Sequence, residues 1–268
     1  MNKTIGFIGC GNMAKAMIGG IVKSKLISSD MIYASDLTKE TLQLAKSEFG
    51  INITTDSLEI AKIVDIIVIA VKPNIYDTVL SSIKDVLNTE KIVVTIAAGK
   101  TIDSIEKVIG NDMKIVRTMP NTPALVNEGM SALCRNKNIT DEDLNTVKSI
   151  FDSFGKSEVV SENMIDAVIG VSGSAPAYVF MFIEAMADAA VSAGMPRKQA
   201  YKFASQAVMG SAKMVLESGK HPGELKDMVC SPGGTTIEAV KTLEEKGLRN
   251  AVIKAMEDCI EKSKEMSK

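Results

Sequence analysis

The feature that most restricts the fold is a glycine-rich turn between an apolar strand and a helical pattern near the N-terminus. The turn follows the apolar run Ile5–Ile8 and reads Gly9-Cys10-Gly11-Asn12-Met13-Ala14. Gly9 permits the tight turn, Gly11 lets backbone approach a phosphate, and Ala14 keeps the helix close to the strand. The helix N-terminus offers unpaired N–H groups to an anion. The pattern predicts a site for the pyrophosphate of a dinucleotide, and an ordinary glycine-rich turn is the alternative.

Five segments in the first 120 residues are candidate strands that alternate with helical patterns. They are Thr4–Ile8, Met31–Ser35, Ile66–Val71, Ile92–Ile96 and Lys114–Arg117. Helices are expected at Thr41–Phe49 and Ile102–Ile109, each closed by a glycine. Because runs such as Ile66–Val71 are apolar throughout, we expect a parallel sheet that is covered on both faces. Right-handed crossovers then predict an α/β fold with a Rossmann-type, doubly wound parallel sheet.

The strand signal ends near Thr140, and the rest of the chain is predicted to be helical. One helix is expected from Thr140 to Phe154, and four or five helical segments follow Ser161. Their wide apolar faces, rich in Ala, Met and Val, favour burial between subunits, and a monomeric bundle is the alternative. The expected domains are a dinucleotide-binding domain at residues 1–160 and an all-α dimerisation domain at residues 161–268.

Composition argues against several classes of function. The formal net charge is −2, so neither nucleic acid nor an acidic membrane surface is an expected partner. The four cysteines are scattered and fit reduced thiols in a cytosolic protein. The single histidine, His221, excludes a multi-histidine metal site, and no metal is expected. The short apolar N-terminal run leads straight into the glycine turn, so no signal peptide is expected. The uncharged stretch Ala167–Ile183 is short for a membrane span and is predicted to be buried against another subunit.

Ligands of open α/β sheets bind beyond the carboxyl ends of the strands, so Ser35 and Asp36 are candidates for binding the adenosine end of a cofactor. A carboxylate there accepts hydrogen bonds from ribose hydroxyls and repels a 2′-phosphate, which favours NADH. Ser35, Thr38 and Lys39 can still hold a phosphate, so NADPH remains open. A helix N-cap is the alternative role of Asp36.

Two further loops follow predicted strands. Ala97 and Ala98 are small and leave room for a flat nicotinamide ring. At the end of another strand, Lys72 is compatible with a surface residue and Pro73 with the start of a helix.

A second glycine turn lies in the helical half and reads Ser231-Pro232-Gly233-Gly234-Thr235-Thr236. It opens onto a predicted helix, where exposed N–H groups, the positive end of the helix dipole and hydroxyl donors favour a small carboxylate. A capped loop between helices is the alternative. His221, directly before a proline, is predicted to be a loop or cap residue rather than a catalyst.

Seven motifs in order make the whole chain resemble the pyrroline-5-carboxylate reductases. They are Gly6-Phe7-Ile8-Gly9-x-Gly11-x-Met13-Ala14, Ala70-Val71-Lys72-Pro73, Ala97-Ala98-Gly99, Arg117-x-Met119-Pro120-Asn121-Thr122-Pro123, Gly173-Ser174-x-Pro176-Ala177-Tyr178, His221-Pro222-Gly223-x-Leu225-x-Asp227 and Ser231-Pro232-Gly233-Gly234-x-Thr236. The last two are the most specific.

The resemblance implies reduction of 1-pyrroline-5-carboxylate to L-proline by hydride transfer from NADPH or NADH, the last step of proline biosynthesis. It also implies a cytoplasmic homodimer that assembles into a higher homo-oligomer, with the substrate pocket at the dimer interface. The implied cofactor-binding residues are Gly9, Cys10, Gly11, Asn12, Met13, Ala14, Ser35, Asp36, Ser57, Ala70, Val71, Lys72, Pro73, Ala97 and Ala98. The implied substrate-binding residues are Glu162, Ser231, Gly233, Gly234, Thr235 and Thr236.

Thr236 is the implied catalytic residue, which orients the ring nitrogen of the substrate. Three departures from the family pattern concern the cofactor. Ser57 stands where many members carry asparagine, Met228 replaces a polar residue, and Leu37 removes a possible phosphate-binding arginine. The competing hypotheses are another small NAD(P)-dependent reductase of the same architecture and a non-enzymatic nucleotide-binding protein.

Overall fold

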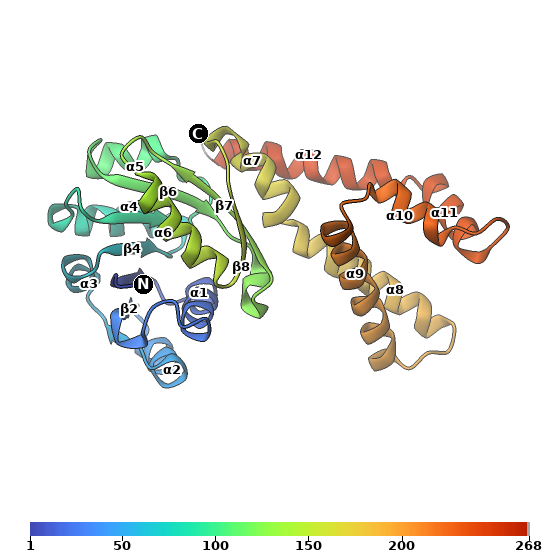
Figure 1. The fold of residues 1–268 in the computed structure, drawn as a ribbon, viewed down its shortest axis with the longest axis horizontal. Helices are drawn as coiled ribbons and strands as arrows, with labels where there is room; N and C mark the ends of the chain where they lie inside the picture. The colour runs from blue at the N-terminus through green and yellow to red at the C-terminus, as the bar shows by residue number, and fades with distance from the viewer. Residues whose placement is uncertain (267–268) are drawn as a thin grey trace. The chain divides into compact units, whose positions relative to one another are not determined.

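A computed structural model describes residues 1–266 of the chain (Figure 1). Contacts between residues divide the chain into two compact units. Unit 1 comprises residues 1–174 together with the chain from Cys259 on, and unit 2 comprises residues 175–258. The expected domain boundary at residues 160 and 161 stays a prediction.

Unit 1 is built on an eight-stranded sheet with the order β3-β2-β1-β4-β5-β6-β7-β8. The strands β1 to β6 pair in parallel, whereas β7 runs antiparallel to β6 and parallel to β8. The order of the first six strands is that of a doubly wound dinucleotide-binding sheet, which confirms the predicted fold class. The strands are β1 (Ile5–Ile8), β2 (Ile32–Ser35), β3 (Asn52–Thr54), β4 (Ile66–Ile69), β5 (Ile92–Thr95), β6 (Lys114–Met119), β7 (Gly129–Arg135) and β8 (Gly155–Val159).

Helices cover both faces of this sheet (Figure 1). They are α1 (Asn12–Lys23), α2 (Lys39–Phe49), α3 (Ser57–Ile63), α4 (Pro73–Ile83), α5 (Ile102–Ile109), α6 (Asp141–Asp152) and α7 (Ile165–Val168). Short helical segments are η1 (Ser29–Met31), η2 (Lys84–Val86), η3 (Thr122–Val126), η4 (Glu162–Met164) and η5 (Ile169–Gly173). Ile66 and Val68 of β4 belong to the hydrophobic cluster with α1 and α6, while Ile67 and Ile69 belong to the cluster with α4 and α5. This alternation explains why β4 is apolar at every position.

Local sequence signals predicted two helix ends correctly. Gly50 ends α2 in the left-handed conformation, with φ +70°. Thr140 and Asp143 form a reciprocal capping box at the start of α6. Both signals depend on residues that lie within one turn of each other.

Other expectations were wrong. The strand signal does not end near Thr140, because β8 pairs with β7, and β3 was also missed. The strand β8 has the sequence Gly-Lys-Ser-Glu-Val and lies at the sheet edge with only Ser157 buried, so it lacks an apolar pattern. Pro123 lies in the first turn of the 3-10 helix η3, where its missing N–H costs nothing.

Unit 2 is helical throughout its regular structure. Its elements are α8 (Ala175–Ser192), α9 (Arg197–Ser218), α10 (Pro222–Val229), α11 (Thr235–Glu245) and the first part of α12 (Leu248–Met266). The helices α8 and α9 pack against each other across a short turn in which Gly194 has φ +97°. Between residues 175 and 258 the buried hydrophobic side chains are small: Ala187, Ala200 and Ala204.

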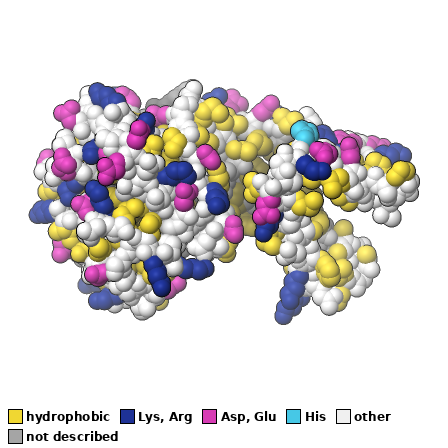
Figure 2. All heavy atoms as spheres, in the orientation of Figure 1, with side chains coloured by type: hydrophobic (Ala, Val, Ile, Leu, Met, Phe, Trp, Pro, Cys, Tyr) yellow, Lys and Arg dark blue, Asp and Glu magenta, His cyan; other side chains and the backbone are white. Residues whose placement is uncertain are grey.

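Large apolar side chains of unit 2 are instead exposed. Phe180 and Met181 of α8 are 63% and 69% exposed, and Phe203 of α9 is 67% exposed. Figure 2 shows hydrophobic side chains at the surface over these helices. The continuous helical stretch Glu162–Ser192 is, by length and composition, apolar enough to cross a membrane, and 17% of its most apolar window is buried. The predicted burial of Ala167–Ile183 is therefore not achieved by the single chain.

Candidate active site

The first glycine turn has the geometry that the sequence predicts. Gly9 has φ +97°, and a Cβ placed on it would lie 2.7 Å from the carbonyl oxygen of Ala70, so only glycine fits. Gly11 is the N-cap of α1 and makes no side-chain capping bond. Apart from its own local backbone and chain neighbours, no described atom lies within 4 Å of where a Cβ on Gly11 would stand. The N-terminus of α1 therefore faces open space and is suited to an anion.

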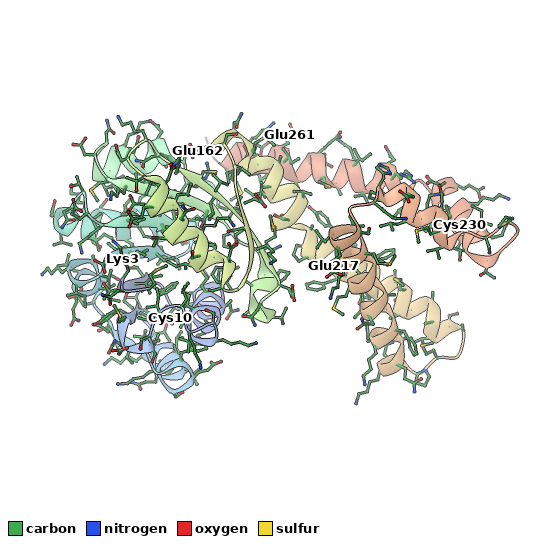
Figure 3. The ribbon with its side chains drawn as sticks, in the orientation of Figure 1. Lys3, Cys10, Glu162, Glu217, Cys230 and Glu261 are labelled. Atoms are coloured by element: carbon green, nitrogen blue, oxygen red, sulfur yellow. The ribbon has the colours of Figure 1, made fainter. Side chains whose placement is uncertain are left out.

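Asp36 connects this turn to the loop after β2. Its Oδ2 accepts a hydrogen bond of 2.9 Å from the backbone N–H of Cys10, and its Oδ1 accepts one of 2.9 Å from that of Thr38. Thr38, not Asp36, is the N-cap of α2, so the simple helix-capping role for Asp36 is wrong. The Cys10 side chain (Figure 3) is buried, and burial raises the pKa of its thiol. Cys10 thus contributes its backbone to this arrangement and keeps a protonated thiol in the core.

The hydroxyl of Ser35 is directed away from solvent. Ser35 is buried, and its Oγ lies 3.1 Å from the Oγ of Ser57 in the first turn of α3. Two residues from the predicted cofactor site are therefore paired with each other. Of the two candidates at the end of β2, Asp36 is the one whose side chain is partly exposed.

The loops after β4 and β5 complete this edge of the sheet. Lys72 is the N-cap of α4 and Pro73 its first residue, which confirms the helix-start interpretation. Ala97 is buried, and its N–H lies 3.3 Å from the Oγ1 of Thr95. Gly99 has φ +77°, and a Cβ on it would lie 2.9 Å from the carbonyl oxygen of Met266 in α12. Parallel strands bring the carboxyl ends of β1, β2, β4 and β5 to the same edge.

Glu162 is held by two donors in unit 1 (Figure 3). Its Oε1 accepts a 2.8 Å hydrogen bond from Nη1 of Arg117 in β6 and another of 2.8 Å from the backbone N–H of Ile102 at the start of α5. The Arg117 side chain is only 5% exposed, whereas that of Glu162 is 33% exposed. The contact was not predicted, although a lone arginine within the apolar strand Lys114–Met119 signals a buried partner.

A buried thiol lies beside this ion pair. Cys134 of β7 is directly opposite Arg117 in the sheet. Burial raises the pKa of the Cys134 thiol to about 11, an effect that the nearby Arg117 guanidinium opposes. The charges of the Arg117–Glu162 pair are therefore compensated by each other and not by a thiolate.

The second glycine turn lies in unit 2. Gly233 has φ +67°, and Gly234 is the N-cap of α11 without a side-chain capping bond. The N–H of Gly234 donates to the carbonyl oxygen of Ser231 at 3.0 Å. A Cβ on Gly234 would lie 2.4 Å from the Oγ of Ser231, so this hydroxyl closely approaches the turn. Thr236 is half-buried in the first turn of α11, and the whole arrangement fits a small carboxylate.

His221 has a structural role in the same unit. It is the N-cap of α10, and its Nδ1 accepts a hydrogen bond of 3.1 Å from the backbone N–H of Gly223. The prediction that His221 is a cap residue is confirmed.

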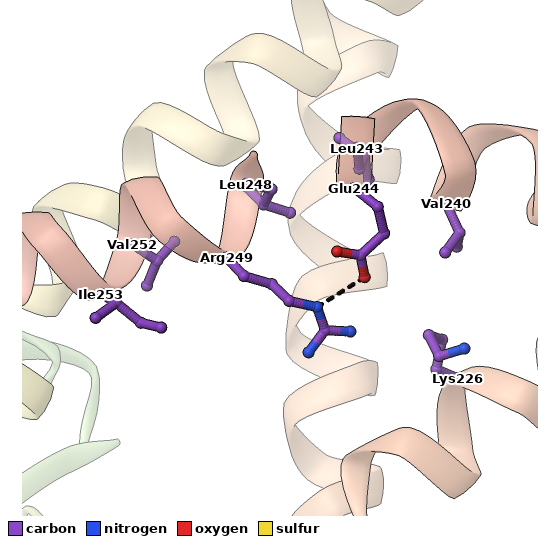
Figure 4. A pocket seen from close by; sticks show the side chains of 8 residues that line it. All are labelled: Lys226, Val240, Leu243, Glu244, Leu248, Arg249, Val252 and Ile253. Carbon is purple, nitrogen blue, oxygen red and sulfur yellow. Dashed lines mark hydrogen bonds and ion pairs between the residues drawn. The ribbon is translucent and has the colours of Figure 1, made fainter. Parts of the chain in front are cut away.

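A groove of about 580 Å³ lies between α10, α11 and α12 in unit 2 (Figure 4). A Glu244–Arg249 ion pair of 2.7 Å spans part of it. None of the predicted substrate-binding residues lines this groove. Its lining residues are Lys226, Val240, Leu243, Glu244, Leu248, Arg249, Val252 and Ile253. Among residues 1–266, no three or more His, Cys, Asp or Glu side chains form a group that could hold a metal ion.

The strand order and the glycine turn at the end of β1 define a Rossmann-type dinucleotide-binding protein with a helical C-terminal region. A family model described as pyrroline-5-carboxylate reductase dimerisation matches residues 162–266. Another, described as NADP oxidoreductase coenzyme F420-dependent, matches residues 4–99. The curated pyrroline-5-carboxylate reductase of Escherichia coli (strain K12) is 59% identical over 268 residues, which is 100% of both chains. The chain belongs to the pyrroline-5-carboxylate reductase family.

Solved structures agree with this assignment. A pyrroline-5-carboxylate reductase from Coxiella burnetii superposes with a TM-score of 0.94 at 36% identity and covers 100% of both chains. A pyrroline carboxylate reductase from Plasmodium falciparum with NADP bound has a TM-score of 0.91 at 36% identity, covering 100% of this chain and 99% of that one. The family resemblance is confirmed, and with it the class of NAD(P)-dependent oxidoreductase.

Proposed function

We propose that this chain reduces 1-pyrroline-5-carboxylate to L-proline by hydride transfer from NADPH or NADH, the last step of proline biosynthesis. One observation carries the proposal. This chain, a member of the family, has two helices that each begin directly after a glycine turn, one at the edge of the Rossmann sheet and one in the helical unit. The first turn suits a pyrophosphate and the second a carboxylate.

The residues present fit a nicotinamide dinucleotide. The open space in front of Gly11 accommodates a phosphate, and the Asp36 carboxylate can accept hydrogen bonds from ribose hydroxyls. The small residues Ala97 and Ala98 would leave room for the flat nicotinamide ring, which supplies the hydride when bound. The full proposed set is the one implied by the family: residues 9–14, Ser35, Asp36, Ser57, residues 70–73, Ala97 and Ala98.

The substrate would be held by the second turn. The Ser231 hydroxyl and the first N–H groups of α11, near Gly233, Gly234 and Thr235, would bind its carboxylate. Thr236 would accept or donate a hydrogen bond at the ring nitrogen and so orient the C=N bond. Threonine is a weak acid, so the proton would come from solvent or already be on the imine. Glu162 is proposed on the substrate side, with its carboxylate oriented by Arg117 and α5.

We propose that a homodimer is the functional unit and that dimers assemble into a higher homo-oligomer in the cytoplasm, with neither nucleic acid nor a membrane as a partner. The dimerisation family model and the exposed apolar side chains of α8 and α9 support association. A second copy would cover the apolar stretch Glu162–Ser192. In this assembly residues 1–160 would bind the cofactor, and residues 161–268 would dimerise and bind substrate.

The reaction is tested with the full-length protein by the loss of NADH or NADPH absorbance on addition of 1-pyrroline-5-carboxylate. We expect turnover with at least one cofactor and L-proline as the product. Thr236→Ala should slow this turnover. Thr242→Ala is its matched control, because Thr242 lies on the same helix and its hydroxyl donates to the Glu238 carbonyl oxygen at 3.2 Å. Absence of turnover with both cofactors at saturating substrate would refute the proposed function.

Assembly is tested on the same preparation by light scattering. Met181→Glu places a charge within the exposed apolar face of α8 and should shift the protein toward the monomer. A wild-type protein that is monomeric at all accessible concentrations would contradict the homodimer.

A further inference from the structure

The C-terminal end of α12, residues 259–266, belongs to unit 1, although the helix begins in unit 2. Cys259 opens this α12 end, and Ser263 lies four residues further along the same face of the helix. Among residues 259–266 Ser263 is the buried one, with 7% of its surface exposed. In Figure 1 the α12 end lies beside α7. The chain therefore returns to the dinucleotide-binding unit after it has formed unit 2.

Two contacts attach the α12 end to unit 1. The Ser263 hydroxyl donates a hydrogen bond of 2.6 Å to Oδ1 of Asp166 in α7, 97 residues earlier in the chain. A hydrogen bond to a carboxylate is stronger than one between neutral groups. Cys259 packs against the hydrophobic cluster that includes Ala97 and Ile102. The helix end is thus fixed to α7 and lies against the core on which the β5–α5 loop is built.

The β5–α5 loop meets the α12 end directly. Gly99 has φ +77°, and a Cβ on it would lie 2.9 Å from the carbonyl oxygen of Met266, so glycine permits this approach. At the far end of the loop the Ile102 N–H is bound by Glu162, which precedes Asp166 by four residues. One short helical stretch, residues 162–166, therefore holds both the end of the loop and the helix that contacts its middle.

This loop carries Ala97 and Ala98, which belong to the proposed nicotinamide site. Hydride transfer requires that the reacting atoms approach to about 3–3.5 Å, so a small displacement of the ring is costly. The pyrophosphate turn at Gly9 and Gly11 follows a different strand and has contacts of its own with the loops after β2 and β4. The two ends of a bound dinucleotide would therefore depend on different parts of the chain.

We propose that the α12 end is a positioning element of the cofactor site and that Ser263 is its positioning residue. Through the Ser263–Asp166 hydrogen bond it holds the β5–α5 loop in the position that receives the nicotinamide ring. The inference rests on the proposed function and deepens it by assigning part of the cofactor site to the C-terminal helix. It predicts that loosening the α12 end weakens binding of the nicotinamide end and leaves binding of the ADP end unchanged.

The decisive measurement compares two ligands by calorimetry on the full-length protein without substrate. The probes are NADH and ADP-ribose, which lacks the nicotinamide, or NADPH and 2′-phospho-ADP-ribose if the protein binds NADPH more tightly. The ratio of the dissociation constant of the ribose compound to that of the reduced nucleotide measures what the nicotinamide adds to binding. A loss of fold stability alone would change both constants together and leave this ratio unmoved.

Three variants loosen the α12 end in different ways. Ser263→Ala should lower the ratio about threefold to tenfold, and a chain that ends at Lys262 should lower it by at least as much. Asp166→Ala should match Ser263→Ala, and the double variant should be no worse than either, because both act through one hydrogen bond. Asp166→Asn keeps an acceptor oxygen and should stay closer to the wild-type ratio than Asp166→Ala. In Ser263→Ala, kcat at saturating nucleotide should also fall.

Ser149→Ala is the matched control. Ser149 is an exposed serine of α6 in unit 1, and its hydroxyl donates to the Asn145 carbonyl oxygen within the helix at 2.8 Å. Its ratio should stay within about twofold of the wild-type value.

The outcomes separate the inference from the proposed function. If no reduced nucleotide binds the wild-type protein, the proposed function fails and takes this inference with it. If the nucleotides bind and the ratio is the same in the wild type, in Ser263→Ala and in the chain that ends at Lys262, the inference alone is overturned. Equal weakening of both ligands in these variants would also overturn it, because the α12 end would then support the fold and not the nicotinamide site.

Discussion

Removal of the Glu162 carboxylate should destabilise unit 1 and loosen the start of α5. One oxygen, Oε1, lies 2.8 Å from both the Arg117 Nη1 and the Ile102 N–H. Glu162→Ala therefore deprives a guanidinium of its partner in a side chain that is only 5% exposed. It also removes the acceptor for an N–H at the N-terminus of α5, where no earlier carbonyl within the helix is available.

The expected size follows from these two losses. Removing one partner of a fully buried ion pair costs about 3–5 kcal/mol. Glu162 is 33% exposed, so water can reach part of the site after truncation, and we expect about 2–3 kcal/mol in the free energy of unfolding. Glu162→Gln keeps an oxygen for Ile102 and should cost about 1 kcal/mol. Adding Arg117→Met to Glu162→Ala should recover part of the loss, because no buried charge is then left unpaired.

The assay is urea unfolding at one fixed protomer concentration, because association contributes to apparent stability. Hydrogen exchange at the Ile102 amide gives a local readout that does not depend on a two-state transition. Glu158→Ala, an exposed glutamate on β8, is the control and should change stability by less than about 0.5 kcal/mol. If Glu162→Ala behaves like the control and leaves hydrogen exchange at the Ile102 amide unchanged, the two hydrogen bonds of Glu162 do not stabilise unit 1 and the reasoning is refuted.

Three further changes test other parts of the structure. Gly9→Ala should abolish measurable NAD(P)H binding or unfold unit 1, because its Cβ would lie 2.7 Å from the Ala70 carbonyl oxygen; nucleotide titration of a folded variant with wild-type affinity would contradict this. Thr236→Ala should lower kcat/KM about 10–100-fold, as expected for loss of one polar contact in the transition state, and unchanged kinetics would remove Thr236 from the mechanism. Burial alone would raise the pKa of Asp143, but hydrogen bonds from Lys114 and Thr140 outweigh it and the pKa is lowered. The stability advantage of wild type over Asp143→Asn should therefore be complete above the unfolded pKa of about 3.9 and be lost as the pH falls through the lower folded value; a gap in urea midpoint that stays constant with pH would refute it.

The local parts of the site followed from short sequence patterns. The turn at Gly9 and Gly11 and the α11 N-terminus at Gly234 both have the backbone that the glycine spacing predicts. These features depend on residues within one turn of each other, so the relevant steric constraints are present in a short segment. The role of Asp36 was only partly predicted, because the carboxylate position follows from the fold whereas the contact with Cys10 does not.

Some elements carried no usable local signal. The strand β8 is short, edge-lying and mostly polar, and it is stabilised by pairing with β7 rather than by its own pattern. Pro123 lies in the first turn of η3. A proline is compatible both with that position and with a loop, so the sequence does not show which of the two it occupies. In both cases tertiary pairing or register outweighed local preference.

The sequence by itself determined the alternation of strands and helices, the two glycine turns and, through its motifs, the family. These properties depend on apolar periodicity and on the backbone freedom of single residues. Only the tertiary structure decided that Asp36 binds the Cys10 N–H and that Glu162 joins Arg117, residues that are 26 and 45 positions apart. The physical reason is that a hydrogen bond requires a separation of about 3 Å, and the packing of distant strands and loops alone brings such donors and acceptors within that reach.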